Sequence, residues 1–178
     1  MKWFFEDQAK AEAIRAELNS WRGTPFHQGG RSKGRGGGTD CVGFCELVMH
    51  ATGVVPEFVF PRRPEDFSPH VHNDKILDYL RGKRSEPESA LLAAAFAEMN
   101  LDELMPKSAC WPFAYTSNAL AGDLAIMRLG IGQWHMPIFL DERNALHCTR
   151  PDGVTECDMT APNYRDRVVA IFRARTAR

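Results

Sequence analysis

The chain has 178 residues, enough for one domain with a sizeable hydrophobic core. Its apolar fraction of 44% and charged fraction of 25% are typical of a globular protein. The formal net charge of -1 gives no general attraction to nucleic acid or to an acidic membrane surface, and we expect neither as a partner. The five cysteines are odd in number and lack dense spacing, which argues against a disulfide scaffold.

The N-terminal sequence MKWFFEDQAK has an apolar run too short for a signal peptide. No stretch of the sequence approaches the length of a membrane span. We therefore expect the protein to be made and folded in a reducing cytoplasm. If it acts outside that compartment, another component has to carry it there.

The first part of the chain has helical periodicity. Apolar residues at three- and four-residue spacing predict an amphipathic helix over Asp7–Trp21. A second helix is expected over Cys41–Thr52, with Thr39 or Asp40 as its N-cap and Gly53 as its C-cap.

The segment from about residue 54 to residue 120 reads as an insertion of helices and irregular structure. Short helices are expected at Asn73–Arg81 and within Ser89–Met105. No internal repeat or long linker divides the chain, so we predict a single domain over residues 1–178 that contains this insertion.

The periodicity changes in the last third of the chain, where short alternating runs are separated by turn residues. These runs predict a meander of about five antiparallel strands at Asp123–Arg128, Trp134–Leu140, Ala145–Thr149, Val154–Met159 and Arg167–Arg173. Helices followed by strands predict an α+β fold in which N-terminal helices pack on a C-terminal antiparallel sheet.

Cys41 is the first candidate for chemistry, because it stands where a glycine-rich loop meets the start of a predicted helix. The N-terminus of a helix has unpaired N–H groups and a partial positive charge, and both stabilise a thiolate. The loop lacks the Gly-Lys-Ser/Thr order of a phosphate-binding loop, and we interpret it as a mobile rim beside Cys41. A buried structural cysteine is the alternative interpretation.

A cysteine nucleophile needs a base, and two histidines lie in the predicted strands. A hairpin centred near Asp141 would place His135 directly opposite His147, on one face of the sheet. The alternate residues would form an apolar face of Met136, Ile138, Leu140, Leu146 and Cys148. If the Cys41 helix packs on the histidine face, one imidazole takes the thiol proton and the other orients it. Pro137 conflicts with a continuous strand here, because proline cannot donate to the ladder.

Four sequence blocks, in this order, resemble the NlpC/P60 family of cell-wall cysteine peptidases. They are W-x-G-T-P-F followed by glycines and Asp40-Cys41-Val42-Gly43-Phe44, then Gly122-Asp123-Leu124, then His135 with an apolar run, then Leu146-His147-Cys148. His27-Gln28 and the long insertion are similar to the subgroup encoded with phage tails and gene transfer particles.

The resemblance implies a papain-like fold and hydrolysis of an amide in peptidoglycan stem peptides, typically D-glutamyl to diamino acid. Cys41 would be the nucleophile, His135 the base, and His147 the residue that orients His135. Stem peptides and phage tail proteins are the implied partners, with delivery to the cell wall in a phage-like particle. No cofactor is implied.

Four further residues are candidates for the substrate cleft: Phe26, His27, Asp40 and Trp134. Phe26 stands where the family usually has a tyrosine whose hydroxyl helps at the active site. Asp40 is interpreted first as a helix cap, and His27 equally well as a plain surface residue.

Three other functions stay open. The chain is compatible with another thiol amidase, such as an interbacterial effector or a small-amide hydrolase. A degenerate structural or adaptor module of a tail assembly is also compatible, given Phe26 and Pro137. A zinc site of His135, His147, Cys148 and Cys157 lacks paired C-x-x-C spacing and is not favoured.

Overall fold

A computed structural model of the chain describes residues 2–58, 75–106, 117–130 and 133–176. The insertion is therefore described only in part, and its proposed boundaries stay a prediction. Within the described residues, no helix is both long enough and apolar enough to cross a membrane.

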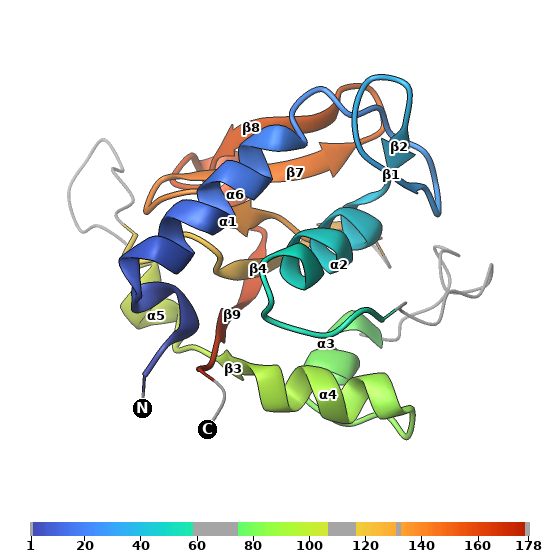
Figure 1. Cartoon of the computed structure of the whole chain (residues 1–178). Coiled ribbons are helices and arrows are strands. Elements are labelled where there is room, and N and C mark those ends of the chain that lie inside the picture. The colour runs from blue at the N-terminus through green and yellow to red at the C-terminus, as the bar shows by residue number, and fades with distance from the viewer. Residues whose placement is uncertain (1, 59–74, 107–116, 131–132, 177–178) are drawn as a thin grey trace.

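Helices and strands follow the predicted α+β order, with strands concentrated toward the C-terminus (Figure 1). The helical elements are η1 (Phe4–Glu6), α1 (Gln8–Ser20), α2 (Cys41–Ala51), α3 (Lys75–Leu80), α4 (Pro87–Ala95), α5 (Leu101–Leu104) and α6 (Pro162–Arg165). The strands are β1 (Arg31–Ser32), β2 (Gly38–Thr39), β3 (Phe96–Glu98), β4 (Leu124–Gly130), β5 (Gln133–His135), β6 (Ile138–Phe139), β7 (Asn144–Thr149), β8 (Gly153–Asp158) and β9 (Val168–Ala174).

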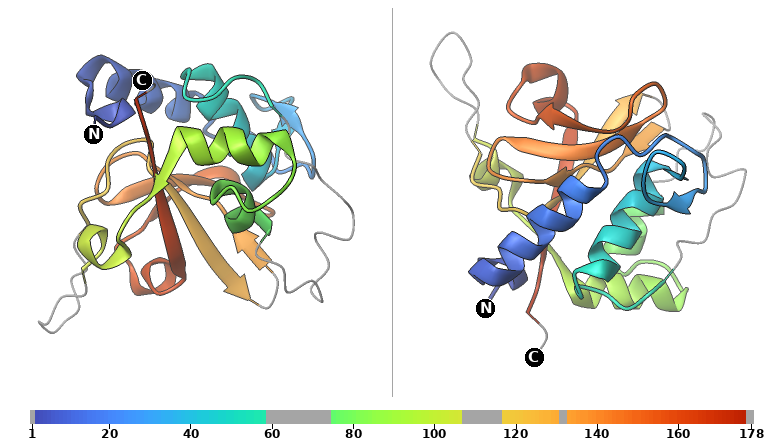
Figure 2. Two further views of the ribbon diagram at one scale, coloured as in Figure 1. Left: turned by 90° about the horizontal axis from the view of Figure 1, so that it is seen from below. Right: turned by 45° about the horizontal axis from the view of Figure 1, so that its top comes forward.

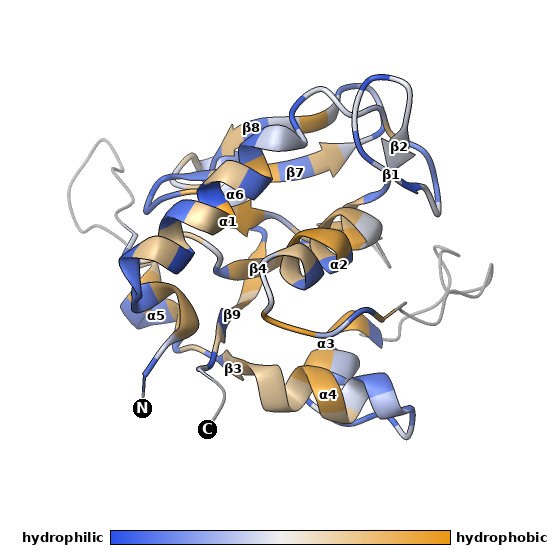
Figure 3. Ribbon diagram, viewed as in Figure 1, coloured by the Kyte–Doolittle hydropathy of each residue, from blue (hydrophilic) through white to orange (hydrophobic). Residues whose placement is uncertain are grey.

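The predicted N-terminal helices are confirmed, and their caps explain where they begin. Asp7 caps α1 by accepting a hydrogen bond from Lys10 N, and Asp40 caps α2 in the same way. The helices α1 and α2 lie side by side in Figure 1 and in the views of Figure 2. The rings of Trp21 and Phe44 meet edge to face between them, with ring centroids 5.8 Å apart. In Figure 3 the ribbon of α2 is hydrophobic over most of its length, as expected for a helix buried against a sheet.

The main sheet has seven strands in the part of the chain that the structure describes, in the order β3-β9-β4-β6-β7-β8, with β5 paired to β4. The antiparallel pairing is confirmed, but the simple meander is wrong because β9 returns to pair between β3 and β4. Two strands were not predicted separately. The strand β3 lies in an alanine-rich run that predicts helix, and the run around Pro137 is divided into β5 and β6.

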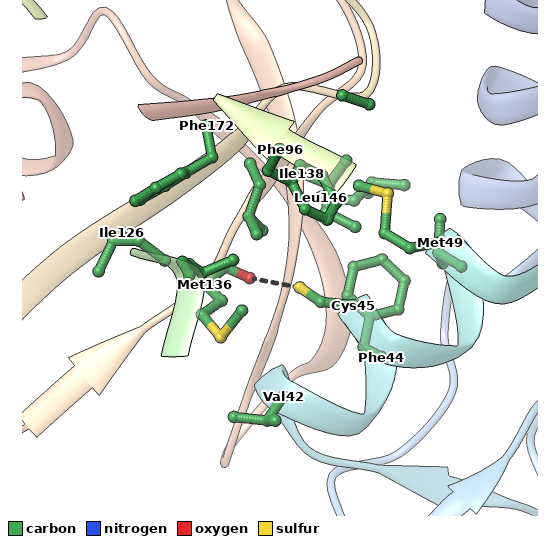
Figure 4. Close-up of a cluster of buried hydrophobic side chains, with 14 of the residues drawn as sticks. Val42, Phe44, Cys45, Met49, Phe96, Ile126, Met136, Ile138, Leu146 and Phe172 are labelled. Atoms are coloured by element: carbon green, nitrogen blue, oxygen red, sulfur yellow. Dashed lines mark hydrogen bonds between the residues drawn. The ribbon is translucent and has the colours of Figure 1, made fainter. Parts of the chain in front are cut away.

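Each face of the sheet covers its own apolar cluster, because neighbouring residues of a strand point to opposite faces. On β7, Leu146 belongs to the cluster beneath α1 and α2, and Ala145 belongs to the second cluster with Tyr164 of α6 packed against it. Figure 4 shows the first cluster, where side chains of α2 meet Ile138 and Leu146 of the sheet.

The glycine-rich loop contains a short hairpin of β1 and β2, and its mobility stays a prediction. Its backbone is held at its start, by Gly29 N donating to Asp40 Oδ2, and in the turn between the two strands, by Gly34 N donating to Thr24 Oγ1. Arg31 of β1 also forms an ion pair with Glu46 of α2, whose side chain is fully buried. These bonds fix the loop against the start of α2.

A buried ion pair joins the start of β4 to β9. Asp123 accepts hydrogen bonds of 2.9 Å and 2.7 Å from Nε and Nη2 of Arg173, and the two residues are 1% and 9% exposed. Burial raises the pKa of Asp123 despite this guanidinium, so desolvation of the carboxylate outweighs the attraction. Such a pair adds little net stability when intact, but either charge is costly when left alone.

We therefore expect Asp123→Asn to lower the free energy of unfolding by about 3 kcal/mol, because Arg173 stays buried without its counter-charge. Urea unfolding at pH 7 measures the change. Arg143→Gln is the matched control, since the Arg143–Asp158 pair is largely exposed and contributes little to stability. Equal losses in both variants would contradict this account.

Candidate active site

Cys41 is the first residue of α2 and is half-buried. One oxygen of Asp40 accepts a 2.8 Å hydrogen bond from Gly43 N in the first turn, and the other accepts a 2.6 Å bond from Gly29 N of the glycine loop. Asp40 is therefore the helix cap, as its position in the sequence indicates, and it also anchors the loop. The thiol consequently stands at the positive end of an eleven-residue helix whose start is held rigidly.

Two other thiols connect the start of α2 to the strands that carry the candidate histidines. Cys45 Sγ donates to the carbonyl oxygen of Met136 over 3.2 Å (Figure 4), and Cys148 Sγ donates to the carbonyl oxygen of Thr39 over 3.2 Å. Met136 directly follows His135, and Cys148 directly follows His147. The helix start and both histidine-bearing segments are thus joined on either side of Cys41.

The two histidines contact each other directly. His135 Nε2 and His147 Nδ1 are 2.9 Å apart, and the ring centroids are 4.9 Å apart at an angle of 67°. Both side chains are buried. Because one nitrogen of each ring is used in this bond, Nδ1 of His135 is the ring nitrogen that remains to accept a proton.

The predicted register between the histidine strands is wrong by two residues. Ile138 pairs with Leu146, so continuing this register would place Pro137, rather than His135, opposite His147. The pairing of this segment with β7 covers Ile138 and Phe139 and does not extend back to His135, which pairs with Met127 of β4 instead. The rings still meet because a displacement of two residues keeps a side chain on the same face of the sheet.

The predicted packing of the Cys41 helix on the histidine face is also wrong. The helix α2 packs on the opposite face, where Met136, Leu146 and Cys148 lie in its cluster, and these residues form the apolar set that the alternation predicts. Cys41 lies at the N-terminal end of this helix. The bonds of Cys45 and Cys148 connect that end to the two segments that carry the histidines.

Burial controls the charge state of the histidine pair. Burial and, to a smaller extent, the charge of His147 together lower the pKa of His135 from 6.5 to about 3. Burial also lowers the pKa of His147, with Asp152 acting in the opposite direction. Both imidazoles are therefore neutral at pH 7, the form in which an imidazole can accept a proton.

The remaining thiols nearby are poorly suited to nucleophilic chemistry. Burial raises the pKa of Cys45 well above its usual value and raises the pKa of Cys148 to about 12. Both are 2% exposed, whereas Cys41 is half-buried. Among these three, Cys41 has the environment of a reactive thiol.

Tyr164 of α6 is a contact that the sequence did not suggest. Its ring packs edge to face against His147, with centroids 5.7 Å apart. It lies 17 residues beyond His147 and belongs to no motif, so no pattern in one sequence indicates it.

The other candidate residues lie around this centre in different settings. Phe26 is half-buried and forms an isolated bridge with Thr39, two residues before Cys41. His27 is exposed, and its ring lies against Gly38, where an added Cβ would come within 2.4 Å of it. Trp134 is half-buried beneath the guanidinium of Arg128.

The described residues contain no group of three or more His, Cys, Asp or Glu side chains that could hold a metal ion. In the imagined zinc site, Cys148 and Cys157 belong to different apolar clusters on opposite faces of the sheet. The geometry therefore gives no support to that site.

The neutral state of His135 predicts a pH dependence of stability. Below pH 6.5 the unfolded chain binds a proton at this residue and the folded chain does not, so stability falls as the pH drops from 6.5 toward 3. Between pH 6.5 and 4.5 this group alone removes about 2 to 3 kcal/mol. His135→Gln should remove that part of the slope in urea unfolding, while His50→Gln, at an exposed position of α2, should leave it unchanged. Parallel slopes for the wild type and His135→Gln would show that His135 titrates normally.

Comparisons with known proteins identify the family and the fold. The family model described as the NlpC/P60 family matches residues 23–173. A comparison with curated protein sequences returned no match.

Three solved structures share the fold. A protein described as similar to lipoprotein, of the NLP/P60 family, from Staphylococcus aureus has a TM-score of 0.55 and 18% identity, covering 96% of this chain and 43% of its own length. The peptidoglycan hydrolase RipB from Mycobacterium tuberculosis has a TM-score of 0.51 and 17% identity, covering 93% and 64%. The NlpC/P60 domain of the peptidoglycan hydrolase SagA has a TM-score of 0.50 and 16% identity, covering 90% and 96%. The chain thus spans less than half of the Staphylococcus protein and nearly all of the SagA domain. The match over residues 23–173 shows that this chain belongs to the NlpC/P60 family.

Proposed function

We propose that this protein is a cell-wall hydrolase, a cysteine peptidase that cleaves an amide bond in peptidoglycan stem peptides. The single observation that carries the proposal is the bonded, neutral His135–His147 pair beside the helix start that bears Cys41. Family membership and the hydrolase names of two structural neighbours support the substrate. The bond that we propose is the one between D-glutamate and a diamino acid.

In the proposed reaction, Cys41 Sγ attacks the scissile carbonyl carbon while its proton passes to Nδ1 of His135. The imidazolium of His135 then donates that proton to the leaving amine, and a thioester to Cys41 remains. Water attacks the thioester with His135 again acting as base, which releases the carboxylate product and restores the thiol. No external oxidant or cofactor enters these steps.

The oxyanion that forms during the attack needs donors that are already in place. The backbone N–H of Cys41 is the proposed donor, because it stands at the N-terminus of α2, where the partial positive charge of the helix favours a developing negative charge. Asp40 supports this role indirectly. By accepting from Gly43 N it fixes the first turn, so the N–H of Cys41 does not have to reorganise during the reaction.

His147 is proposed as a positioning residue. When its own Nδ1 carries no proton, His147 accepts a hydrogen bond from the Nε2–H group of His135. This bond selects the tautomer of His135 in which Nδ1 is unprotonated and can act as the base. The edge-to-face contact with Tyr164 restrains the His147 ring in turn.

Delivery by a phage-like particle is the proposed route to the cell wall, and it rests on the sequence resemblance alone. Co-sedimentation of the protein with purified particles tests it, and a protein absent from the particle fraction would refute it. An adaptor role without catalysis would appear as particle association with no hydrolysis.

We expect the purified protein to release diamino-acid peptides from muropeptides, and we expect Cys41→Ala to lower kcat by at least about a thousandfold because the nucleophile is lost. Chromatography of digested muropeptides measures the cleavage. Cys157→Ala is the control, since that thiol is buried on the other face of the sheet and should leave turnover unchanged. Equal turnover by Cys41→Ala would remove Cys41 from the mechanism. Cleavage of simple amides but not of muropeptides would favour a different thiol amidase.

A positioning role for His147 predicts a graded response. His147→Ala should lower kcat by about a hundredfold with little change in KM, because the base loses its orientation rather than its substrate contacts. His147→Asn keeps an acceptor at a similar position and should restore at least a tenth of the activity. If the two variants are equally impaired, the hydrogen bond to His135 is not what matters at this position.

A further inference from the structure

Arg150 is held on the ring of Phe26. It lies in the turn between β7 and β8, and its Cζ is 5.6 Å from the centroid of the Phe26 ring, within the range of a cation–π contact. The contact restrains a long side chain that is otherwise exposed. A guanidinium stacked in this way keeps its edge, with its N–H donors, free to bind a planar anion.

The two segments that meet in this contact are fixed to each other by backbone bonds. Gly23 N donates to the carbonyl oxygen of Val154 over 2.9 Å, and Val154 N donates to that of Thr24 over 2.8 Å. Gly153 has a φ of +67°, and a Cβ there would lie 2.2 Å from the Thr24 oxygen. Only glycine therefore permits the β7–β8 turn to approach this closely, and the approach places Arg150 over Phe26.

The contact between Phe26 and Arg150 adjoins the start of α2. Phe26 is bridged to Thr39, and Thr39 N donates to the carbonyl oxygen of Pro25 over 3.0 Å. From the other side, Cys148 Sγ donates to Thr39 O, and Arg150 follows Cys148 by two residues. Both partners of the contact are therefore connected to Thr39, two residues before Cys41.

The charge of Arg150 is not balanced within the part of the chain that the structure describes. No carboxylate there lies within 4 Å of it, whereas many of the other arginines form ion pairs, namely Arg22, Arg31, Arg81, Arg84, Arg143 and Arg173. Two carboxylates lie close to these segments in the sequence, and both accept hydrogen bonds from groups other than Arg150. Asp152 accepts from Thr149 Oγ1, and Asp40 accepts from Gly29 N and Gly43 N.

We propose that Arg150, presented by Phe26, determines specificity by binding a carboxylate of the substrate next to the scissile amide. The inference rests on the proposed function and narrows it to anionic peptides. In a γ-linked D-glutamyl residue, three carbons separate the scissile carbonyl carbon from the free α-carboxylate, so a cation beside the nucleophile selects peptides in which this carboxylate is not amidated. Phe26 serves as the support for that cation, a role that its ring can fill without a hydroxyl group.

Binding to the full-length Cys41→Ala protein tests the proposal separately from catalysis. The probes are two synthetic stem tetrapeptides that differ only in the D-glutamyl α-group, a carboxylate in one and a carboxamide in the other. Calorimetry should show about tenfold tighter binding of the carboxylate peptide, the size expected for one charge-assisted contact near the surface. Adding Arg150→Gln should weaken the carboxylate peptide alone, by the same factor. Phe26→Leu should reduce the preference, because the guanidinium loses its support.

Arg143→Gln in the Cys41→Ala background is the matched control, since Arg143 precedes β7 at its other end and should leave the preference intact. Equal dissociation constants for the two peptides, no binding of either, or a preference that survives Arg150→Gln would overturn the proposal. Turnover by the protein with Cys41 intact is a separate result. A retained preference without turnover would refute the peptidase and leave Arg150 as a carboxylate-binding residue.

Discussion

The candidate site depends on the two hydrogen bonds that the carboxylate of Asp40 accepts. Its two oxygens accept from Gly43 N in the first turn of α2 and from Gly29 N in the glycine loop. A single buried side chain thereby fixes the start of the helix, the position of Cys41 and the path of the loop. Because an N-cap satisfies N–H groups that would otherwise be buried without a partner, this arrangement also stabilises the helix, by about 1 kcal/mol in typical proteins.

The break at Pro137 is the second constraint on the site. Proline cannot donate a backbone hydrogen bond, so the strand that carries His135 ends before β6 begins. The carbonyl oxygen of Met136, in this break, accepts a hydrogen bond from Cys45 Sγ. The interruption that looked like a flaw in the sequence pattern is therefore where the helix joins the histidine-bearing segment.

Local patterns predicted the elements well, because the signals for them are local. The cap at Asp40, the apolar stripe of α1 and the alternation on β7 each depend on residues a few positions apart. The family resemblance rested on motifs in order along the chain, and it held for the fold. Pairing was harder to predict. The return of β9 beside β4 is set by contacts between segments far apart in the chain. The register of β6 with β7 depends on the geometry of the turn between them, where Leu140 N and Asp141 N both donate to Asn144 O, and the alternation of apolar residues does not specify that geometry.

The side chains around the candidate site also divide into those that the sequence indicates and those that only the structure reveals. Cys41, His135 and His147 stand out because their chemistry is unusual at their positions in the pattern. Tyr164 and Arg150 carry no such signal, since an aromatic residue in a short helix and an arginine in a turn are both common. Each becomes visible only through the tertiary contact that it makes.

The burial of the histidine pair has a consequence for the proposed chemistry. Charging His135 in the resting protein is unfavourable, because its surroundings hold its pKa at about 3. A neutral His135 is the form that can take the proton of Cys41 as the thiol attacks the substrate. The imidazolium then forms at the moment when an oxyanion forms at the N-terminus of α2, so the two new charges stabilise each other in a poorly solvated site. A substrate carboxylate held by Arg150 would be neutralised by its own partner and would not disturb that balance. In the bound complex the Arg150–carboxylate pair and the histidine pair are both neutral overall, so the charges left uncompensated near the reacting atoms are those that the reaction itself creates.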